Sequence, residues 1–408
     1  MNPKHAAPDV TGLIHHPYVP PAGFAAPQPG VFKASTVYFP TVAAMRQFEW
    51  KDKSAYTYGL HGTPTTYTLE ERLCALEGGQ QCLLVPSGLA ALATVALALL
   101  KTGDEVLLPD NAYGPNKALA EGELRHYGIT HQYYDPMRPD DLSARLNERT
   151  RLVWLEAPGS VSMEFPDLPE LVRRCRAQGV LCALDNTWGA GLAFQPFDLL
   201  RDGGLGVDIS AHALTKYPSG GGDVLMGSIV TRDAALHLKI KLCHMRLGLG
   251  VGANDAEAVL RSLPSIALRY AAHDQSARVL ATWWQGQSPC VQVLHPAMPD
   301  SPGHAHWQSL CGGQDGGLAA GLFSVMIDAR YTQAQVDAFC DGLTLFKIGY
   351  SWGGPVSLVM PYKLESMRQQ APAYLRPGTL VRFSVGLESA GDLRRDLQQS
   401  VARHLPAV

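Results

Sequence analysis

Short apolar runs alternate with stretches of helical apolar spacing between residue 63 and about residue 262. Runs typical of buried strands occur at 82–86, 105–109, 151–156, 180–184 and 224–230, and helical patterns occur at 69–76, 89–100, 116–127 and 168–178. This alternation predicts an α/β domain with a mostly parallel sheet. Such sheets bind ligands beyond the carboxyl ends of their strands, so the residues that follow each strand are where a site is expected.

An arm and a smaller domain flank this segment, and 408 residues are enough for two domains and an arm. Residues 1–62 are rich in proline and show little periodicity beyond one short helix expected near 42–48. We expect an extended arm that contacts a neighbouring subunit; a free terminus is the alternative for the first thirty residues. Residues 263–408 predict an α+β domain, with strands at 321–328, 343–351 and 379–386 and a closing helix at 392–403.

Composition excludes several classes of protein. Lysine and arginine number 34 against 37 acidic residues, a net charge of -3 without a basic block, which argues against nucleic-acid and acidic-membrane binding. The longest apolar run, at 89–100, has 12 residues and is too short to cross a bilayer. The eight cysteines form no C-x-x-C pair, and no secretory signal is visible, so we expect free thiols and a cytoplasmic protein.

Two further patterns are weak as ligand sites. His295, His304 and His306 match no standard set of metal ligands, so they predict loop histidines and no metal site. The glycine cluster at 311–317 is followed by no helix, as a phosphate-binding loop would require, and predicts a turn before a strand.

Asp185 follows directly on a continuous apolar strand, in VLCALDNTWGAG. A carboxylate at that position is partly desolvated, so it needs a cation or strong hydrogen-bond donors to keep its charge. The alternative is an aspartate that caps a turn.

Lys216 lies after a predicted strand and before glycines, in ALTKYPSGGG. Most lysines are solvated, but here Thr215 and the glycines leave space for a planar group beside the amine. A lysine in such surroundings can form a Schiff base, which is how pyridoxal phosphate attaches to its enzymes. Asp185 on the ring nitrogen and Lys216 on the aldehyde would make one site.

Three other segments carry candidate site residues. Ser87 and Gly88 begin a helix directly after a strand, which offers backbone N–H groups to a phosphate, or Ser87 is an ordinary helix cap. Tyr113 could stack on an aromatic ring or be a loop tyrosine. Arg382 lies among apolar residues of a strand, so it needs an anion, either Glu388 or a substrate carboxylate.

Ten ordered segments give the chain a family resemblance from about residue 30 to its end. They are FKASTVYFPT, YTYGLHGTPT, LEERLCALEGG, PSGLAAL, NAYGP, LEAPGSVSMEFPD, LDNTWGAG, ALTKY, YSWGG and VRFSVGLE. Together they resemble the pyridoxal-phosphate enzymes of cysteine and methionine metabolism. The resemblance implies the type I, aspartate-aminotransferase-like fold, with a mostly parallel seven-stranded sheet.

The resemblance also implies roles for individual residues. Lys216 would bind the cofactor aldehyde, Asp185 would pair with the pyridine nitrogen, and Tyr113 would stack on the ring. The positions that match phosphate contacts are Ser87, Gly88, Leu89 and Thr215. The positions that match the substrate pocket are Arg382 and Ser351, which would hold a carboxylate, and Tyr350 and Trp352, which would wall the pocket.

Tyr58 matches a tyrosine that enters the site from a neighbouring subunit and takes part in catalysis. The resemblance therefore implies at least a dimer, usually a tetramer made of two dimers. Two departures from the family pattern weaken the phosphate site: Leu60 replaces a common arginine, and Ala213 replaces a frequent serine. His61 or another group would have to replace the arginine.

The segments YSWGG and APGSVSME are most similar to those of the cystathionine beta-lyases in this family. They imply beta-elimination of cystathionine to homocysteine, pyruvate and ammonia. A gamma-lyase, or a sulfhydrylase acting on an activated homoserine, is the alternative within the family. A non-catalytic binding or regulatory protein on the same fold is a more distant alternative, favoured only by Leu60.

Overall fold

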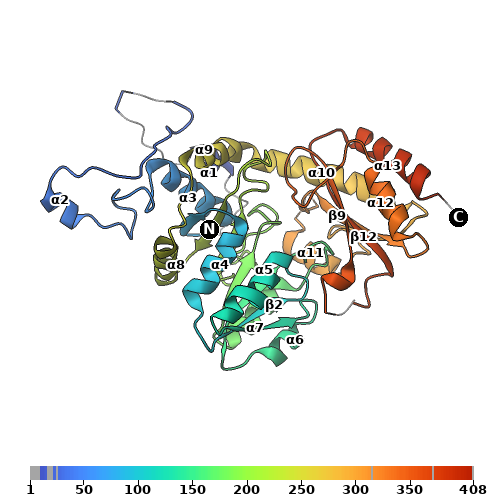
Figure 1. The fold of residues 1–408 in the computed structure, drawn as a ribbon, viewed down its shortest axis with the longest axis horizontal. Helices are drawn as coiled ribbons and strands as arrows, with labels where there is room; N and C mark the ends of the chain where they lie inside the picture. The colour runs from blue at the N-terminus through green and yellow to red at the C-terminus, as the bar shows by residue number, and fades with distance from the viewer. Residues whose placement is uncertain (1–9, 16–21, 24–25, 314–315, 370–371, 407–408) are drawn as a thin grey trace.

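The computed structural model describes residues 10–15, 22–23, 26–313, 316–369 and 372–406. Its larger sheet has seven strands (Figure 1), in the order β1 (Gln81–Val85), β7 (Gly227–Thr231), β6 (Ile209–Ala213), β5 (Leu181–Asp185), β4 (Thr150–Glu156), β2 (Glu105–Pro109) and β3 (Thr130–Tyr134). The ladders from β6 to β3 are parallel, and β7 is antiparallel to both of its neighbours. The mostly parallel seven-stranded sheet expected from the sequence is confirmed.

Helices cover both faces of this sheet because side chains of each strand point alternately to opposite faces. Leu83 and Val85 of β1 pack into one buried cluster, whereas Cys82 and Leu84 pack into another. The helices of this part are α3 (Pro64–Glu77), α4 (Gly88–Leu99), α5 (Gly114–Leu119), α6 (Pro139–Arg145), α7 (Leu168–Ala177), α8 (Ala234–Leu247) and α9 (Ala253–Ser262). A one-turn π-helix, Ala120–Leu124, continues α5.

A second sheet of five strands forms the C-terminal part, which lies to the right in Figure 1. Its order is β10 (Lys347–Ile348), β11 (Leu358–Tyr362), β12 (Gly378–Ser384), β9 (Leu322–Asp328) and β8 (Cys290–Leu294). Its helices are α11 (His304–Cys311), α12 (Gln333–Asp341) and α13 (Ala390–His404). The long helix α10 (Ile266–Gln285) leads from the first part into the second and packs against β8, β9 and α13.

The predicted strand at 343–351 is wrong over most of its length, since only Lys347–Ile348 is extended in a ladder. The carboxylate of Asp396 explains the difference: it accepts hydrogen bonds from the backbone N–H groups of Thr344, Leu345 and Phe346. Backbone groups held by one carboxylate are turned into a tight loop and cannot pair with a neighbouring strand.

Four strands were given no bounds from the sequence, namely β3, β6, β8 and β11, although a strand was expected before Lys216, where β6 lies. Their sequences are short and carry polar residues or proline, as in THQYY and LVMPY, so the apolar pattern is weak.

His304 and His306 were expected in a loop but lie in the first turn of α11, and His295 is fully buried after β8. Residues 314–315 of the glycine cluster lie outside the described residues.

The arm contains the expected short helix, α2 (Val42–Gln47), and an unexpected one, α1 (Val10–His15). Helix α1 packs against α3 of the same chain, and Leu13 is completely buried there. Beyond Phe32, whose backbone N–H donates to the Thr65 hydroxyl of α3 at 2.8 Å, the arm extends away from the body as far as α2 (Figure 1), with Tyr38 and Met45 among its exposed side chains. Subunit contact by the arm stays a prediction.

Among the described residues, no helix combines the length and apolarity needed to cross a membrane. All eight cysteines are free.

A buried carboxylate ties α3 to the sheet. Glu77, at the end of α3, is fully buried and accepts hydrogen bonds from Ser210 and from His212 Nδ1, the latter at 2.9 Å. Asn186 Nδ2 donates to the same carboxylate at 3.4 Å. Because Ser210 and His212 belong to β6 and Asn186 follows β5, this carboxylate aligns the two strands whose ends carry Asp185 and Lys216.

We expect Glu77→Ala to lower the free energy of unfolding by about 3 kcal/mol, because three buried polar groups lose their shared partner. Chemical denaturation followed by circular dichroism measures this. The control is Glu170→Ala, which removes ion pairs of a partly exposed carboxylate with Arg173 and Arg174 and should cost less than about 1 kcal/mol. Equal losses for the two variants would contradict the role given to Glu77.

Candidate active site

Asp185 and Lys216 lie at the same edge of the large sheet. Asp185 is the last residue of β5 and is paired in register with Ala211 of β6. Lys216 lies three residues beyond the end of β6, which runs parallel to β5. The Lys216 Nζ atom donates a hydrogen bond of 2.9 Å to Ser351 Oγ and lies 5.3 Å from the ring centre of Trp352. The structure thus brings two of the predicted residues, Ser351 and Trp352, to the amine of a third.

The surroundings of Lys216 favour the neutral amine. Burial, together with the positive charge of Arg382, lowers the pKa of Lys216 to about 8, and the charge of Asp185 opposes this shift only in part. An ordinary lysine has a pKa near 10.5. A much larger fraction of this amine is therefore unprotonated near neutral pH, and only the unprotonated form attacks an aldehyde.

Asp185 is held by donors from the turn that follows it. Its Oδ1 atom accepts from the backbone N–H of Thr187 at 3.1 Å and from the Thr187 hydroxyl at 2.5 Å. Burial raises the pKa of Asp185, while the Thr187 hydrogen bonds and the charges of His212 and Lys216 oppose the rise. Asp185 therefore does hold the turn that follows it, as the alternative interpretation of the sequence expected. This role is compatible with a ligand contact by the same carboxylate.

The start of α4 packs closely against the end of β6. Ser87 caps the helix, its Oγ accepting from the Ala90 N–H at 3.0 Å. A Cβ atom on Gly88 would lie 2.6 Å from the Cβ of Ala213, so a side chain there would push the helix away. Leu89 is 38% exposed beside them. Across the edge, the Thr215 hydroxyl donates to the Met226 carbonyl at 3.3 Å.

Tyr113 precedes α5, and its backbone N–H donates a 2.7 Å hydrogen bond to Glu156 Oε2. Glu156 ends β4 and is paired in register with Asp185, so two carboxyl groups stand side by side. Burial and the charge of Asp185 raise the pKa of Glu156 well above its usual range. Sequence reasoning missed Glu156, although it ends its strand RLVWLE just as Asp185 ends VLCALD.

Arg382, on β12, is nearly buried and has no carboxylate partner among the described residues. One terminal nitrogen, Nη2, donates to the Tyr350 carbonyl at 2.8 Å, and its Nε has no hydrogen-bond partner. Glu388 is not the partner, since its carboxylate accepts from the Ser357 N–H and hydroxyl, both at 2.8 Å. A buried guanidinium with a free donor is suited to bind a ligand carboxylate.

Tyr362 of β11 is a second residue that sequence reasoning missed. The Arg382 guanidinium carbon lies 5.4 Å from its ring centre, within the range of a cation–π contact. Tyr362 also contributes to the raised pKa of Tyr113, which places the two phenols near one another. Trp352 is half-buried beside Lys216, whereas the Tyr350 side chain is 75% exposed.

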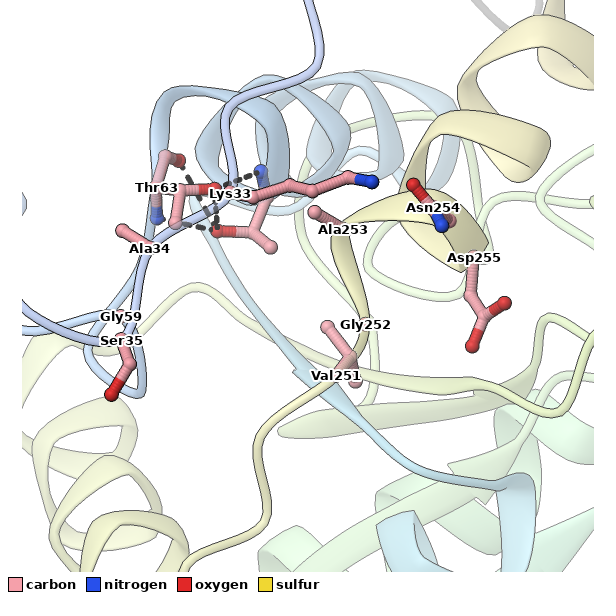
Figure 2. A pocket seen from close by; sticks show the side chains of 11 residues that line it. Lys33, Ala34, Ser35, Gly59, Thr63, Val251, Gly252, Ala253, Asn254 and Asp255 are labelled. Carbon is pink, nitrogen blue, oxygen red and sulfur yellow. Dashed lines mark hydrogen bonds between the residues drawn. The ribbon is translucent and has the colours of Figure 1, made fainter.

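Tyr58 does not join this group within one chain. It lies in the arm, where it forms a β-bridge with Thr36 and contacts the ring of His61. A cleft of about 560 Å³ opens beside this segment, between the arm and the start of α9 (Figure 2). Gly59 and Lys33 line that cleft, and Lys216 does not, so the Tyr58 segment borders a different hollow in its own chain.

A sequence profile of the Cys/Met metabolism PLP-dependent enzymes matches residues 10–402. The chain belongs to this family. It is similar to a cystathionine beta-lyase of Bordetella avium, with 37% identity and 98% of each chain covered. It is also similar to an L-alanine/L-glutamate racemase of Wolbachia pipientis wMel, with 33% identity and 93% of each chain covered. The crystal structure of metB from Corynebacterium glutamicum superposes with a TM-score of 0.85, at 25% identity and 97% coverage of both chains.

As a member of this family the protein is a pyridoxal-phosphate-dependent enzyme, and its fold is the type I fold expected from the sequence. The residues at the sheet edge fit the cofactor. Lys216 is a desolvated amine, Asp185 a carboxylate suited to a ring nitrogen, and the start of α4 a source of N–H groups for a phosphate. The unpartnered Nε of Arg382 adds a place for a substrate carboxylate.

The two departures from the family pattern, Ala213 and Leu60, have different surroundings in the structure. Ala213 packs against Gly88, and its backbone N–H donates to the Thr187 hydroxyl at 3.0 Å. His61, named above as a substitute for the arginine missing at Leu60, stacks on Trp50 at 4.4 Å, and its Nδ1 is bonded to the Thr57 hydroxyl at 2.8 Å. Burial and the charge of Lys241 lower the pKa of His61, so it is a weak source of positive charge.

We expect Gly88→Ala to weaken pyridoxal-phosphate binding about tenfold, because the added methyl group would displace the start of α4 from β6. The dissociation constant is measured by titrating the apoprotein and following cofactor absorbance. Gly122→Ala is the control, since a Cβ at Gly122 meets open space. Unchanged affinity in Gly88→Ala would show that the phosphate does not depend on this helix start.

Proposed function

We propose that the protein catalyses beta-elimination from a cysteine thioether, with cystathionine as the first candidate substrate. The products would be homocysteine, pyruvate and ammonia. The observation that carries the proposal is the grouping of Lys216, Asp185 and Arg382, in which the pKa of the amine is lowered to about 8 and the guanidinium has no acidic partner among the described residues. The name of the Bordetella avium relative, and the YSWGG segment, support the choice of substrate.

In the proposed reaction each residue has a separate task. Arg382 and Ser351 hold the substrate carboxylate and thereby orient the α-carbon toward Lys216. Pyridoxal phosphate, when bound, supplies a ring that stabilises negative charge on the α-carbon. Asp185 holds a proton on the ring nitrogen, and Tyr113 keeps the ring in place by stacking.

Lys216 moves the protons. Its neutral amine accepts the proton of the α-carbon, the carbon–sulfur bond breaks, and its ammonium form returns a proton to the departing thiolate. The three-carbon fragment then takes up water and leaves as pyruvate and ammonia. One molecule of water is consumed for each thioether cleaved, and no oxidant or reductant is required.

We further propose that the working enzyme is a homo-oligomer, at least a dimer, in the form of a tetramer of two dimers. Within one chain Tyr58 contacts Thr36 and His61 of the arm, and that arm extends from the body with exposed Tyr38 and Met45. A neighbouring chain would then supply Tyr58 to the site. A cytoplasmic location stays our expectation.

The relatives leave a second activity open. The similarity to an L-alanine/L-glutamate racemase at 33% identity supports a second candidate activity, in which the proton returns to the α-carbon and no thiolate is lost. Gamma-elimination and sulfhydrylation use the same cofactor and are alternative activities within the family. A non-catalytic binding or regulatory role is a more distant alternative.

We expect the purified protein to be yellow and to release pyruvate from cystathionine, and Lys216→Ala to lose both the absorbance band and at least about 10³-fold of turnover, as for removal of a base and cofactor tether. Product analysis decides the class. 2-Oxobutyrate would replace our assignment with gamma-elimination, and a D-amino acid without keto acid would replace it with racemisation. A wild type that binds no pyridoxal phosphate would end the proposal.

We expect the rate of imine formation between the apoprotein and added pyridoxal phosphate to rise with pH through a midpoint near 8, because the Lys216 amine loses its proton at its lowered pKa of about 8. Stopped-flow absorbance measures the rate. Arg382→Gln removes a charge that lowers this pKa, so its midpoint should move upward toward that of an ordinary lysine. Identical midpoints in the two proteins would show that Arg382 does not act on the amine.

A further inference from the structure

The loop that follows β4 has an unusual backbone. Val161 and Met163 have φ angles of +68° and +59°, in the left-handed region. That region is disfavoured for residues with a side chain, and most of all for a β-branched residue such as valine. Such a conformation persists only where surrounding contacts hold it, so the contacts of this loop indicate what it is for.

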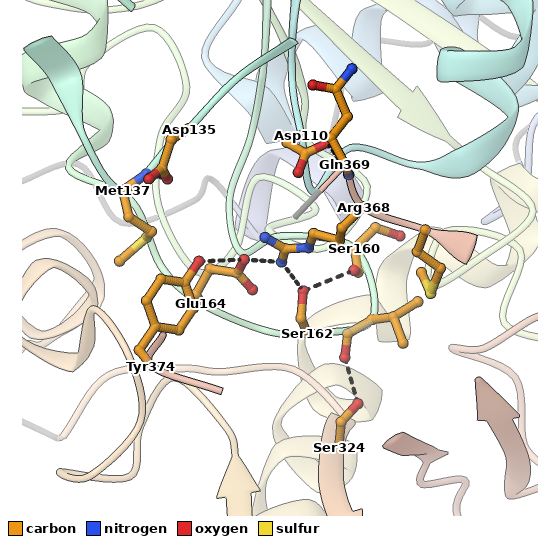
Figure 3. A network of polar contacts seen from close by, with 12 residues as sticks. Asp110, Asp135, Met137, Ser160, Ser162, Glu164, Ser324, Arg368, Gln369 and Tyr374 are labelled. Carbon is orange, nitrogen blue, oxygen red and sulfur yellow. Dashed lines mark hydrogen bonds and ion pairs between the residues drawn. The ribbon is translucent and has the colours of Figure 1, made fainter. Parts of the chain in front are cut away.

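The contacts come from both parts of the molecule (Figure 3). The hydroxyl of Ser324, on β9 of the small sheet, donates to the Val161 carbonyl at 2.5 Å. Arg368, also from the C-terminal part, donates to the Ser162 hydroxyl and to the carboxylate of Glu164. Glu164 is fully buried and also accepts from the Tyr374 hydroxyl at 3.0 Å.

The backbone around Arg368 is itself fastened to the end of β2. Lys117 donates to the Met367 carbonyl at 2.8 Å and forms an ion pair of 3.2 Å with Asp110. The backbone N–H of Gln369 donates to the same carboxylate of Asp110 at 3.3 Å. Arg368 therefore reaches the loop from a fixed position.

The loop and its contacts border the candidate active site on two sides. Glu156, just before the loop, holds the backbone N–H of Tyr113, and the Ser160 N–H donates to the Asn111 carbonyl at 2.9 Å. On the other side, Ser324 is paired in register with Arg382 across β9 and β12. Residues that face each other in adjacent strands place their side chains on the same face of the sheet.

We propose that Ser324 and Arg368 are positioning residues, which hold the strained loop between the two sheets and so fix Arg382 relative to Tyr113 and Lys216. This inference rests on the proposed function, because it takes Arg382 to be the group that binds the substrate carboxylate. Ser324 and Arg368 do not touch the reacting atoms, and the proposal gives them a role in substrate affinity.

The test is the affinity of the holoenzyme for L-alanine, an amino acid without a leaving group, read from the change in cofactor absorbance. We expect Ser324→Ala to raise the dissociation constant about fivefold, the scale of one lost hydrogen bond, with the cofactor band of the unliganded enzyme unchanged. The control is Ser400→Ala, which removes a buried hydrogen bond of 2.7 Å from a serine hydroxyl to the Phe339 carbonyl elsewhere in the C-terminal part. Its melting temperature should fall comparably and its affinity should stay within twofold.

A rescue variant separates positioning from general stability. Glycine accepts positive φ without strain, so Val161→Gly in the Ser324→Ala background should recover most of the lost affinity. If Ser324→Ala does not fold, Arg368→Lys, which keeps the charge but loses the Nη2 atom that donates to both Ser162 and Glu164, takes its place with the same expectation.

Wild-type affinity in the folded Ser324→Ala or Arg368→Lys variant, or equal weakening in Ser400→Ala, would overturn the inference. Failure of the proposed function looks different, since it would appear in the wild type as absent pyruvate. L-alanine binding still reports on the loop in that case, because it requires the cofactor and Arg382 but no elimination.

Discussion

The site depends on ionisable groups that are buried without being paired to one another. Asp185 and Glu156 end neighbouring strands, Lys216 lies three residues beyond β6, and Arg382 lies on β12 of the second sheet. Within the described part of the chain, none of the four forms an ion pair within 4.0 Å, and the nearest bonds of Lys216 and Arg382 go to a hydroxyl and to carbonyls. A buried charge without a counter-charge is costly, so this arrangement favours a ligand that brings a cationic ring nitrogen and a carboxylate together.

Stability for this arrangement comes from the rest of the fold. Both faces of the large sheet are covered by apolar side chains, and Glu77 satisfies the polar groups beneath β5 and β6. The strained backbone at Val161 and Met163 costs on the order of 1–3 kcal/mol per residue. Contacts from Ser324 and Arg368 offset that cost, which links the docking of the two sheets to the conformation beside Tyr113.

Much of this was accessible from the sequence because each prediction rested on a local pattern. The ends of apolar strands located Asp185 and Lys216, and a serine before an apolar helix located Ser87. What failed depended on distant partners. The turn at Thr344 is made by Asp396, fifty-two residues later, and Arg368 meets Glu164 across two hundred and four residues, so neither pairing leaves a signal in its own segment. Glu156 was within reach of the strand-end rule, whereas Tyr362 was not, because β11 (LVMPY) contains proline and was not recognised as a strand.

The proton chemistry within one chain favours elimination over racemisation. Racemisation by two bases needs a second acceptor on the opposite side of the α-carbon, whereas elimination needs one group that takes a proton from carbon and gives one to sulfur. Lys216, with its lowered pKa, suits the single-base role. Burial and the charges of Asp185 and Glu156 raise the pKa of Tyr113, so this phenol stays protonated and serves better as a donor than as a second base.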